Sequence, residues 1–173
     1  GVLANTTSTP YKVFWGGSKT QALYTAAELT SLGLIAGSSI SSIGHVILTG
    51  EPLLMNNYSV SVGFVSSTTL GTGFIAAPTT TILNNVAYTP PTGTGNIDYT
   101  LTTPIVWDGV SSLLVETCFN NNDGGGGSVN SLSVASSTVA TGLNLYRTQD
   151  NTIDVCSNST APSGTTTRPN LRI

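Results

Sequence analysis

Apolar and polar residues alternate along much of the chain with the period of two that is typical of β-strands. The segment YSVSVGFVS is the clearest case, because Tyr58 and every second residue up to Phe64 form one face while serines and Gly63 form the other. Each run of this kind predicts a short strand with one buried face. Similar runs occur at residues 11–15, 43–48, 97–101, 112–119, 131–135, 143–147 and 153–156.

Turn-forming residues separate these runs, in stretches such as LTGEP, SSTTLGTG, TPPTGTG and NNNDGGGG. Many short strands joined by turns, without alternating helices, predict an all-β fold, an antiparallel β-sandwich of jelly-roll-like type. The 173 residues suit one core and contain no long linker, so residues 1–173 are predicted to form a single domain.

One segment, LYTAAELTSLGL, has a helical pattern instead. Thr25 and Glu28 have the spacing of a capping box, and Gly33 is suited to end a helix. The pattern predicts one short helix over residues 26–32 that covers an end or edge of the sandwich with Leu29 and Leu32.

The polar residues of the chain are mostly neutral. Only 8% of the residues are charged and the formal net charge is -3, whereas Ser and Thr supply 49 residues and Asn supplies 14. So little like-charge repulsion favours association with copies of the same chain. The five basic residues form no stripe for a phosphate backbone, and no apolar run has the length of a membrane helix. Nucleic-acid binding and membrane insertion are therefore not expected.

Cys118 and Cys156 are the only cysteines, and they do not form a CxxC motif. Without clustered histidines they cannot build a zinc site, which leaves a disulfide or two buried free thiols. The charge-poor composition of exported character favours the disulfide, because disulfides persist in oxidising compartments.

Glu116 lies in the apolar run SSLLVETCF, on the same predicted face as Leu114 and Cys118. A buried carboxyl with a raised pKa could serve as a general acid. No second carboxylate has a partner spacing for glycosidase chemistry, so a rim position, or a carboxylate bonded to an arginine or to backbone amides, is favoured. Glycines 124–127 lack the lysine and helix of a phosphate loop and predict a flexible hairpin loop.

Acidic loops and a single histidine suggest two further kinds of chemistry. Asp108, Asp123, Asp150 and Asp154 lie in or near oxygen-rich loops, which makes a calcium ion conceivable, but their spacing does not match an EF-hand and no ligand set is assigned. His45 is the only histidine, and the chain has no nucleophile elbow, so a structural role is favoured over a catalytic one. No cofactor is expected.

Exposed aromatic residues could form a sugar-stacking platform, with Trp15 and Trp107 as the candidates, although both are also suited to packing at the edge of the core. The N-x-[ST] pattern marks Asn5, Asn57 and Asn158 as candidate glycosylation sites.

Five stretches of the sequence carry a family resemblance: TPYKVFWGGSKTQALYTAAELTSLGL, SISSIGHVI, MNNYSVSVGF, TTPIVWDGVSSLLVETCFNNND and TRPNLRI. Over residues 10–173 the chain resembles a domain family of secreted and cell-surface proteins of Bacteroidota. The resemblance implies a jelly-roll-like sandwich in adhesin-like or gliding-associated proteins, without a family-wide set of catalytic residues. Family members are commonly modules of longer proteins, so the chain is expected to be a processed product or a stand-alone subunit.

These observations predict an extracellular or cell-surface protein without enzymatic activity, which assembles with copies of itself into a filament or layer. Residues 1–9 are the predicted assembly arm, which would add a strand to the exposed sheet edge of a neighbouring copy. Its alternating side chains, such as Val2 and Ala4, would give this pairing its specificity. The alternative is a carbohydrate-binding module or adhesin tip that binds surface glycans through exposed aromatic residues. Hydrolase activity is disfavoured because no acid, base or nucleophile is paired.

Overall fold

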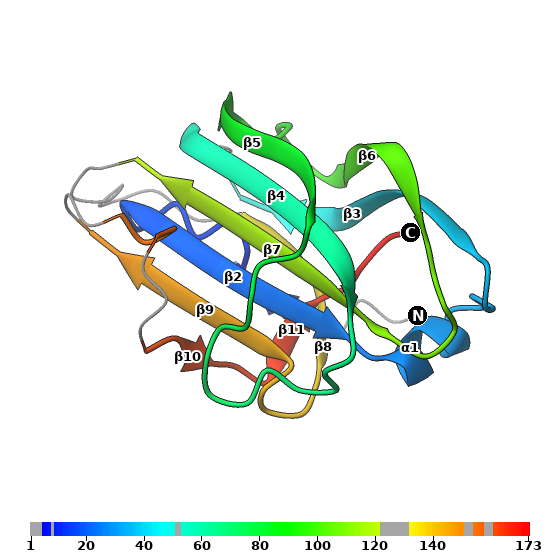
Figure 1. Ribbon diagram of the computed structural model, residues 1–173. Helices are drawn as coiled ribbons and strands as arrows, with labels where there is room; N and C mark the ends of the chain where they lie inside the picture. Colours follow the sequence, from blue (N-terminus) through cyan, green and yellow to red (C-terminus); the bar gives the residue numbers. More distant parts are fainter. Residues whose placement is uncertain (1–4, 8, 51–52, 122–131, 151–153, 158–160) are drawn as a thin grey trace.

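The computed structural model describes residues 5–7, 9–50, 53–121, 132–150, 154–157 and 161–173. These residues form two antiparallel sheets that pack face to face, with one short helix at the end of the sandwich (Figure 1). The first sheet contains β1 (Asn5–Thr7), β8 (Ser133–Thr138), β3 (Ser39–Thr49), β6 (Gly95–Val106) and β11 (Thr167–Pro169). The second contains β10 (Ser163–Gly164), β9 (Asn144–Gln149), β2 (Gly17–Tyr24), β7 (Ser112–Asn120), β4 (Met55–Val65) and β5 (Thr80–Tyr88).

The strand order identifies the sandwich as a jelly roll. β1 to β8 are arranged as β1-β8-β3-β6 in one sheet and β2-β7-β4-β5 in the other, so the chain alternates between the sheets as two interleaved Greek keys do. β9 and β10 extend the second sheet beyond β2, and β11 pairs with β8. The predicted all-β, jelly-roll-like sandwich is confirmed.

The main core lies between the two sheets and includes a chain of buried hydroxyl groups. The Tyr99 hydroxyl bonds the hydroxyls of Tyr11, at 2.9 Å, and Tyr58, at 2.8 Å. The Tyr11 hydroxyl also lies 3.1 Å from Nδ1 of His45. Because each of these three tyrosine hydroxyls has a partner, the core can hold the tyrosines without the cost of an unpaired phenol.

A second, smaller core lies on the outer face of the six-stranded sheet. Residues 66–79, between β4 and β5, cross this face and cover it (Figure 1). Leu70 packs there with Leu23, Leu114 and Leu145. The buried Gln21 side chain holds the crossing segment, since its Nε2 donates to the Ile75 carbonyl at 2.8 Å and its Oε1 accepts from the Ile75 N–H at 3.0 Å. β7 is consequently covered on both faces.

The helix prediction is confirmed, with α1 observed at Ala26–Ser31. Thr25 and Glu28 form the capping box, and Gly33, at φ 94, provides the left-handed residue that ends the helix. Leu29 is fully buried as expected. Leu32 is 59% exposed, so the prediction that it also covers the sandwich is wrong.

Two predicted strands are wrong, and four strands were not predicted. Residues 11–15 form turns, because the Val13 and Trp15 N–H groups bond the carbonyls two and three residues earlier. Residues 154–157 also form a turn, in which the Asp154 carboxylate accepts the Cys156 N–H at 2.9 Å and so replaces a strand partner. The alternation of the sequence did not mark β2, β5, β10 and β11.

The predicted disulfide between Cys118 and Cys156 is present and joins two residues that are 38 positions apart in the sequence. It fastens the turn at 154–157 to β7 and agrees with folding in an oxidising compartment. No helix among the described residues has the length and apolar character needed to cross a membrane.

Candidate functional site

Glu116 and His45, the two residues first considered for catalysis, lie on different faces of the six-stranded sheet. Glu116 belongs to the outer face, together with Leu114 and Cys118, as the alternation predicts. His45 lies in the main core beyond the inner face, next to Thr20, Ala22 and Thr117. The sheet separates the two side chains, so they cannot act on one substrate atom.

Glu116 holds polar neighbours on the covered outer face. Its Oε2 accepts a hydrogen bond from Gln21 Nε2 at 2.6 Å and lies 3.6 Å from Lys19 Nζ. Lys19 also donates to the Cys156 carbonyl at 3.3 Å. Glu116 thus has amide and lysine partners rather than the arginine or backbone amides considered from the sequence, and its role here is structural.

His45 is a neutral core residue. Burial lowers its pKa to about 4, against the opposing effect of the Asp98 carboxylate. The ring contacts Tyr11 edge-on, with the ring centroids 5.8 Å apart. A base with so low a pKa and no access to solvent is unsuited to proton transfer near neutral pH.

The aspartates considered for calcium have local partners. Asp108 accepts the N–H groups of Val110 and Ser111 in its turn, and Asp150 accepts the Gly16 N–H at 3.0 Å. Asp154 caps the turn described above, and Asp123 lies outside the described residues. Within the described ranges, no three His, Cys, Asp or Glu side chains lie close enough to hold a metal ion.

The other predicted sites divide between accessible, buried and undescribed residues. Trp107 is 1% exposed, so it cannot stack on a sugar and belongs to the core. Trp15 is 37% exposed and forms an edge-to-face pair with Phe14, which is also exposed. Asn57 is exposed, although its Nδ2 donates to the Asn120 carbonyl at 3.1 Å.

Part of the predicted assembly arm belongs to the molecule's own sheet. β1, at Asn5–Thr7, pairs with β8 of the same chain. Val2, Ala4, Asn158 and glycines 124–127 lie outside the described residues, as does the side chain of Asn5. Their predicted roles stay predictions.

Exposed apolar side chains concentrate at the end of the sandwich that carries α1, a region called here the α1 end. In the segment after α1, Leu32 and Ile35 are exposed, Ile35 to 73%. Val106, the last residue of β6, is 61% exposed, and Val110 in the β6–β7 connection is 79% exposed. These segments touch, because the Gly37 N–H donates to the Trp107 carbonyl at 2.8 Å. Two grooves of about 390 and 310 Å³ flank Leu32 and share Leu171.

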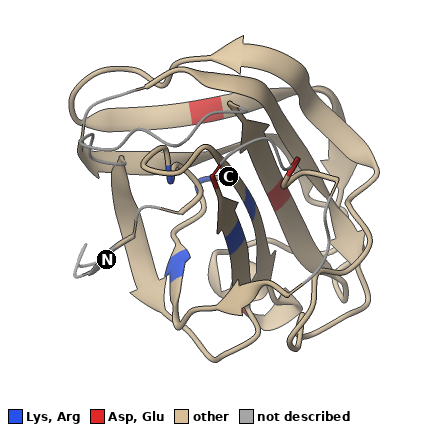
Figure 2. Ribbon diagram, turned by 90° about the vertical axis from the view of Figure 1, so that its left-hand side faces the viewer, with Lys and Arg blue, Asp and Glu red and all other residues tan. Residues whose placement is uncertain are grey.

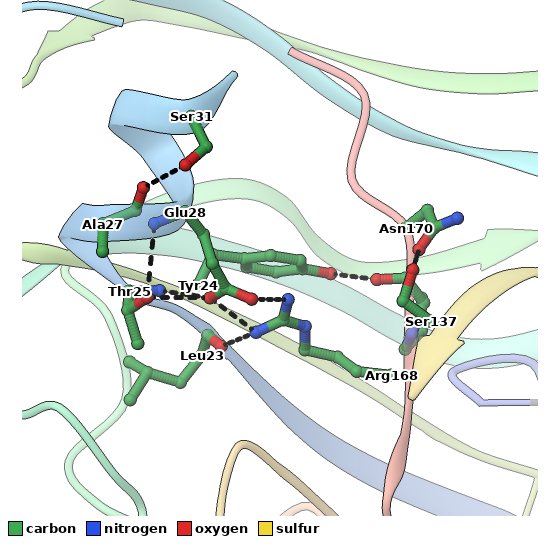
Figure 3. A network of polar contacts seen from close by, with 10 residues as sticks. Leu23, Tyr24, Thr25, Ala27, Glu28, Ser31, Ser137, Arg168 and Asn170 are labelled. Carbon is green, nitrogen blue, oxygen red and sulfur yellow. Dashed lines mark hydrogen bonds and ion pairs between the residues drawn. The ribbon is translucent and has the colours of Figure 1, made fainter. Parts of the chain in front are cut away.

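A polar cluster around Arg168 fixes the α1 end (Figure 3). The Arg168 guanidinium is almost fully buried and binds Glu28 with two nitrogens, Nη2–Oε1 at 2.6 Å and Nη1–Oε2 at 3.1 Å. It also donates to the Leu23 carbonyl and lies over the Tyr24 ring, 4.2 Å from its centroid. The Tyr24 hydroxyl in turn donates to the Pro169 carbonyl at 2.8 Å. These contacts join α1, the end of β2 and the C-terminal segment into one rigid unit.

Glu28 remains charged in this cluster. Burial by itself raises the pKa of its carboxyl, but the hydrogen bonds from Arg168 and from the Thr25 N–H outweigh burial and hold the pKa below its ordinary value. The ion pair neutralises the only two charges in this cluster. The cluster therefore supports an apolar surface without adding net charge to it.

The sequence held only a partial signal for the α1 end. The segment LGLIAG and the pair Val106 and Val110 are apolar, but apolar residues beside predicted strands are ordinarily core residues. Only the fold shows that these side chains point outward. The Arg168–Glu28 pair joins residues 140 positions apart, which no local pattern reveals.

No match to the chain was found among protein-family models, curated proteins or solved structures. The resemblance to surface proteins of Bacteroidota therefore stays a prediction.

Proposed function

We propose that this protein is an extracellular, non-catalytic structural or adhesive subunit that associates with copies of itself through the α1 end and the neighbouring edge of β6. The observation that carries the proposal is the exposure of Leu32, Ile35, Val106 and Val110 on segments that pack together. Exposed apolar surface of this kind, on an otherwise polar molecule, is typical of a protein–protein contact.

The β6 edge supports a second copy as the partner. β6 is the last strand of its sheet, so its outer backbone groups can pair with another strand. Its only charged residue, Asp98, is paired with Arg172 at 3.0 Å. The few charged residues are scattered over both sheets (Figure 2), and none of the residues from Tyr99 to Trp107 is charged. Two copies of such an edge can meet across a twofold axis without like-charge repulsion.

The disulfide supports an extracellular location for the subunit. Disulfides form and persist outside the reducing cytosol. The neutral, Ser-, Thr- and Asn-rich composition suits a protein that contacts other surfaces outside the cell. Assembly into a filament or layer would use the α1 end together with a second contact elsewhere on the molecule. The predicted N-terminal arm is one candidate for that second contact.

The experiment is sedimentation velocity of the full chain over a concentration series, with electron microscopy of the concentrated protein. We expect dimers or larger species that increase with concentration. Ile35→Lys with Val110→Lys should shift the protein toward monomer, because the added ammonium groups place like charges across the contact. Thr102→Lys, which adds a charge to exposed β6, should do the same.

The matched control is Ser163→Lys, which adds the same charge to an exposed position of β10, at the edge of the six-stranded sheet beyond β9. It should leave association unchanged. The proposal is wrong if the unaltered chain stays monomeric at the highest concentration, or if Ser163→Lys disrupts association as strongly as the other variants.

A further inference from the structure

An open pocket of about 420 Å³ lies at the opposite end of the six-stranded sheet from α1, and is called here the asparagine pocket. The described residues that line it are Asn57, Asn85, Asn120, Asp154, Cys156 and Ser157. The volume is in the range of about 300–1,000 Å³ typical of small-ligand sites. Apart from the disulfide-bonded Cys156, these residues carry carboxamide, carboxyl or hydroxyl groups, whereas the grooves at the α1 end are lined in part by leucines.

The fold brings these residues together from four separate segments. Asn57 belongs to β4, Asn85 to β5 and Asn120 to the end of β7, while Asp154 and Ser157 come from the turn that the disulfide fastens to β7. The β4–β5 pairing shifts register on both sides of Tyr58. Such bulges re-aim side chains that regular pairing would point elsewhere.

Asn57 and Asn85 both have left-handed backbone conformations, with φ 53 and φ 52. This region is unfavourable for most residues, but asparagine tolerates it better than other side-chain-bearing residues do. Two such positions facing one pocket mean that the local backbone is arranged around the carboxamides.

Hydrogen bonds hold the pocket walls in place. Asp154 Oδ1 accepts from Asn120 Nδ2 at 3.2 Å, and its Oδ2 accepts from the Ser157 hydroxyl. Asn57 Nδ2 donates to the Asn120 carbonyl at 3.1 Å. The Asn85 N–H donates to Ser59 Oγ at 3.0 Å, and that hydroxyl donates back to Asn85 Oδ1 at 3.3 Å. A site fixed in advance loses less conformational entropy when a ligand binds.

The chemistry of the lining favours a neutral ligand. The Ser157 hydroxyl, followed by the backbone N–H groups of the turn, lowers the pKa of Asp154, so this carboxylate stays ionised and disfavours phosphate or carboxylate ligands. Both Asp154 oxygens already accept hydrogen bonds, and among the described residues of the lining it is the only carboxylate. A calcium ion usually needs two or more convergent carboxylates with free oxygens.

Carboxamides are suited to hydroxyl ligands, because each combines an acceptor oxygen with a donor nitrogen. A sugar ring presents adjacent hydroxyls that need this combination. We propose that the asparagine pocket binds a neutral sugar residue of a glycan, held by hydrogen bonds from its carboxamides. This site differs from the aromatic platform expected from the sequence, and it does not depend on self-association.

The first measurement is a titration of the ¹⁵N-labelled full chain with neutral monosaccharides and short neutral oligosaccharides, followed through the side-chain amide signals in NMR spectra. We expect concentration-dependent shifts of the Asn57, Asn85 and Asn120 side-chain signals with at least one neutral sugar. A sialylated oligosaccharide is the acidic comparison and should bind more weakly. The absence of shifts with every neutral sugar, or preference for the acidic one, would overturn the proposal.

The second measurement compares the affinity of variants for the sugar that binds best. Asn85→Gly removes a carboxamide and keeps a residue that accepts the left-handed backbone. It should weaken binding about tenfold, the effect of losing one or two hydrogen bonds. Asn84→Gly, at the neighbouring exposed position of β5 outside the pocket lining, is the matched control and should leave affinity unchanged. If Trp15→Ala abolishes binding while Asn85→Gly does not, the sugar binds the aromatic pair and the pocket assignment is wrong.

Discussion

The α1 end and the asparagine pocket lie at opposite ends of the same sheet, and their loops are held by different means. β2 begins near the pocket and runs directly into α1, so its eight residues separate the regions by about 25 Å. At the α1 end an ion pair and apolar packing hold the loops, and the exposed surface is apolar. At the pocket a disulfide and a turn capped by Asp154 hold them, and polar side chains line the pocket. One sandwich can thus present a surface for its own copies at one end and a neutral polar site at the other.

The largest expected effect comes from the disulfide. Replacing both cysteines, Cys118→Ser with Cys156→Ser, should lower the free energy of unfolding by about 4 kcal/mol, because the loop of 38 residues is no longer closed in the unfolded chain. Urea denaturation under oxidising conditions measures this loss. Hydrogen exchange should show lost protection at residues 154–157, whereas α1 keeps its protection. An equal loss at both ends would contradict the separation of the two regions.

His45, in the core between the two regions, should make stability depend on pH without involving either end. Its pKa is about 4 in the folded protein and near 6.5 when unfolded, so only the unfolded chain takes up a proton between these values. Stability is therefore complete above about pH 6.5 and decreases by about 3 kcal/mol as the pH falls to about 4.

The control for the pH effect is His45→Asn, which keeps a side-chain acceptor near the Tyr11 hydroxyl but does not titrate. The variant should be less stable overall, because it is smaller, and its stability should change less over the same pH range. The remaining change belongs to carboxylates with lowered pKa values, Glu28, Asp108 and Asp154, whose stabilisation is lost at lower pH. Identical pH profiles for the variant and the unaltered chain would show that His45 does not titrate as described.

Arg168→Met should cost about 2 kcal/mol and act at the α1 end alone. The change leaves Glu28 and the Leu23 carbonyl without their guanidinium partner, and breaking a fully buried pair costs about 3–5 kcal/mol. The smaller value is expected because the Glu28 side chain is 36% exposed and stays partly hydrated. Thermal unfolding measures the loss, and hydrogen exchange should locate it in α1 and residues 167–173. A loss of protection at residues 154–157 instead would contradict the assignment.

The sequence predicted the parts of this molecule that depend on local patterns. Alternation marked β3, β4, β6 and β7, and the capping box marked α1. β2 was missed because its outer face carries Lys19 and Gln21, which look solvent-exposed in the sequence. Both side chains are in fact covered and bonded, to Glu116 and Ile75 among others, through contacts made by residues far along the chain.

The two candidate regions were hidden for the same reason. Asn57, Asn85 and Asn120 are each ordinary turn formers in the sequence, and only strand register and two left-handed residues bring them to one pocket. Ile35 and Val110 are of residue types that ordinarily lie in the core, but their side chains are exposed. Local patterns specify which residues form strands, whereas the surface that a residue reaches depends on pairing between distant segments.

The smallest effect on stability is expected from Arg172→Met, the exposed counterpart of Arg168→Met. The side chains of Arg172 and Asp98 are 41% and 44% exposed, so their ion pair should contribute only about 0.5 kcal/mol. The change leaves Asp98 as an unpaired charge on the β6 edge. If copies meet at that edge, each copy brings one unpaired charge to β6 beside the contact, and association should weaken more than stability. Added salt should restore association by screening the repulsion. Sedimentation at low and high salt measures this, and association that is unchanged at low salt would place the contact away from β6.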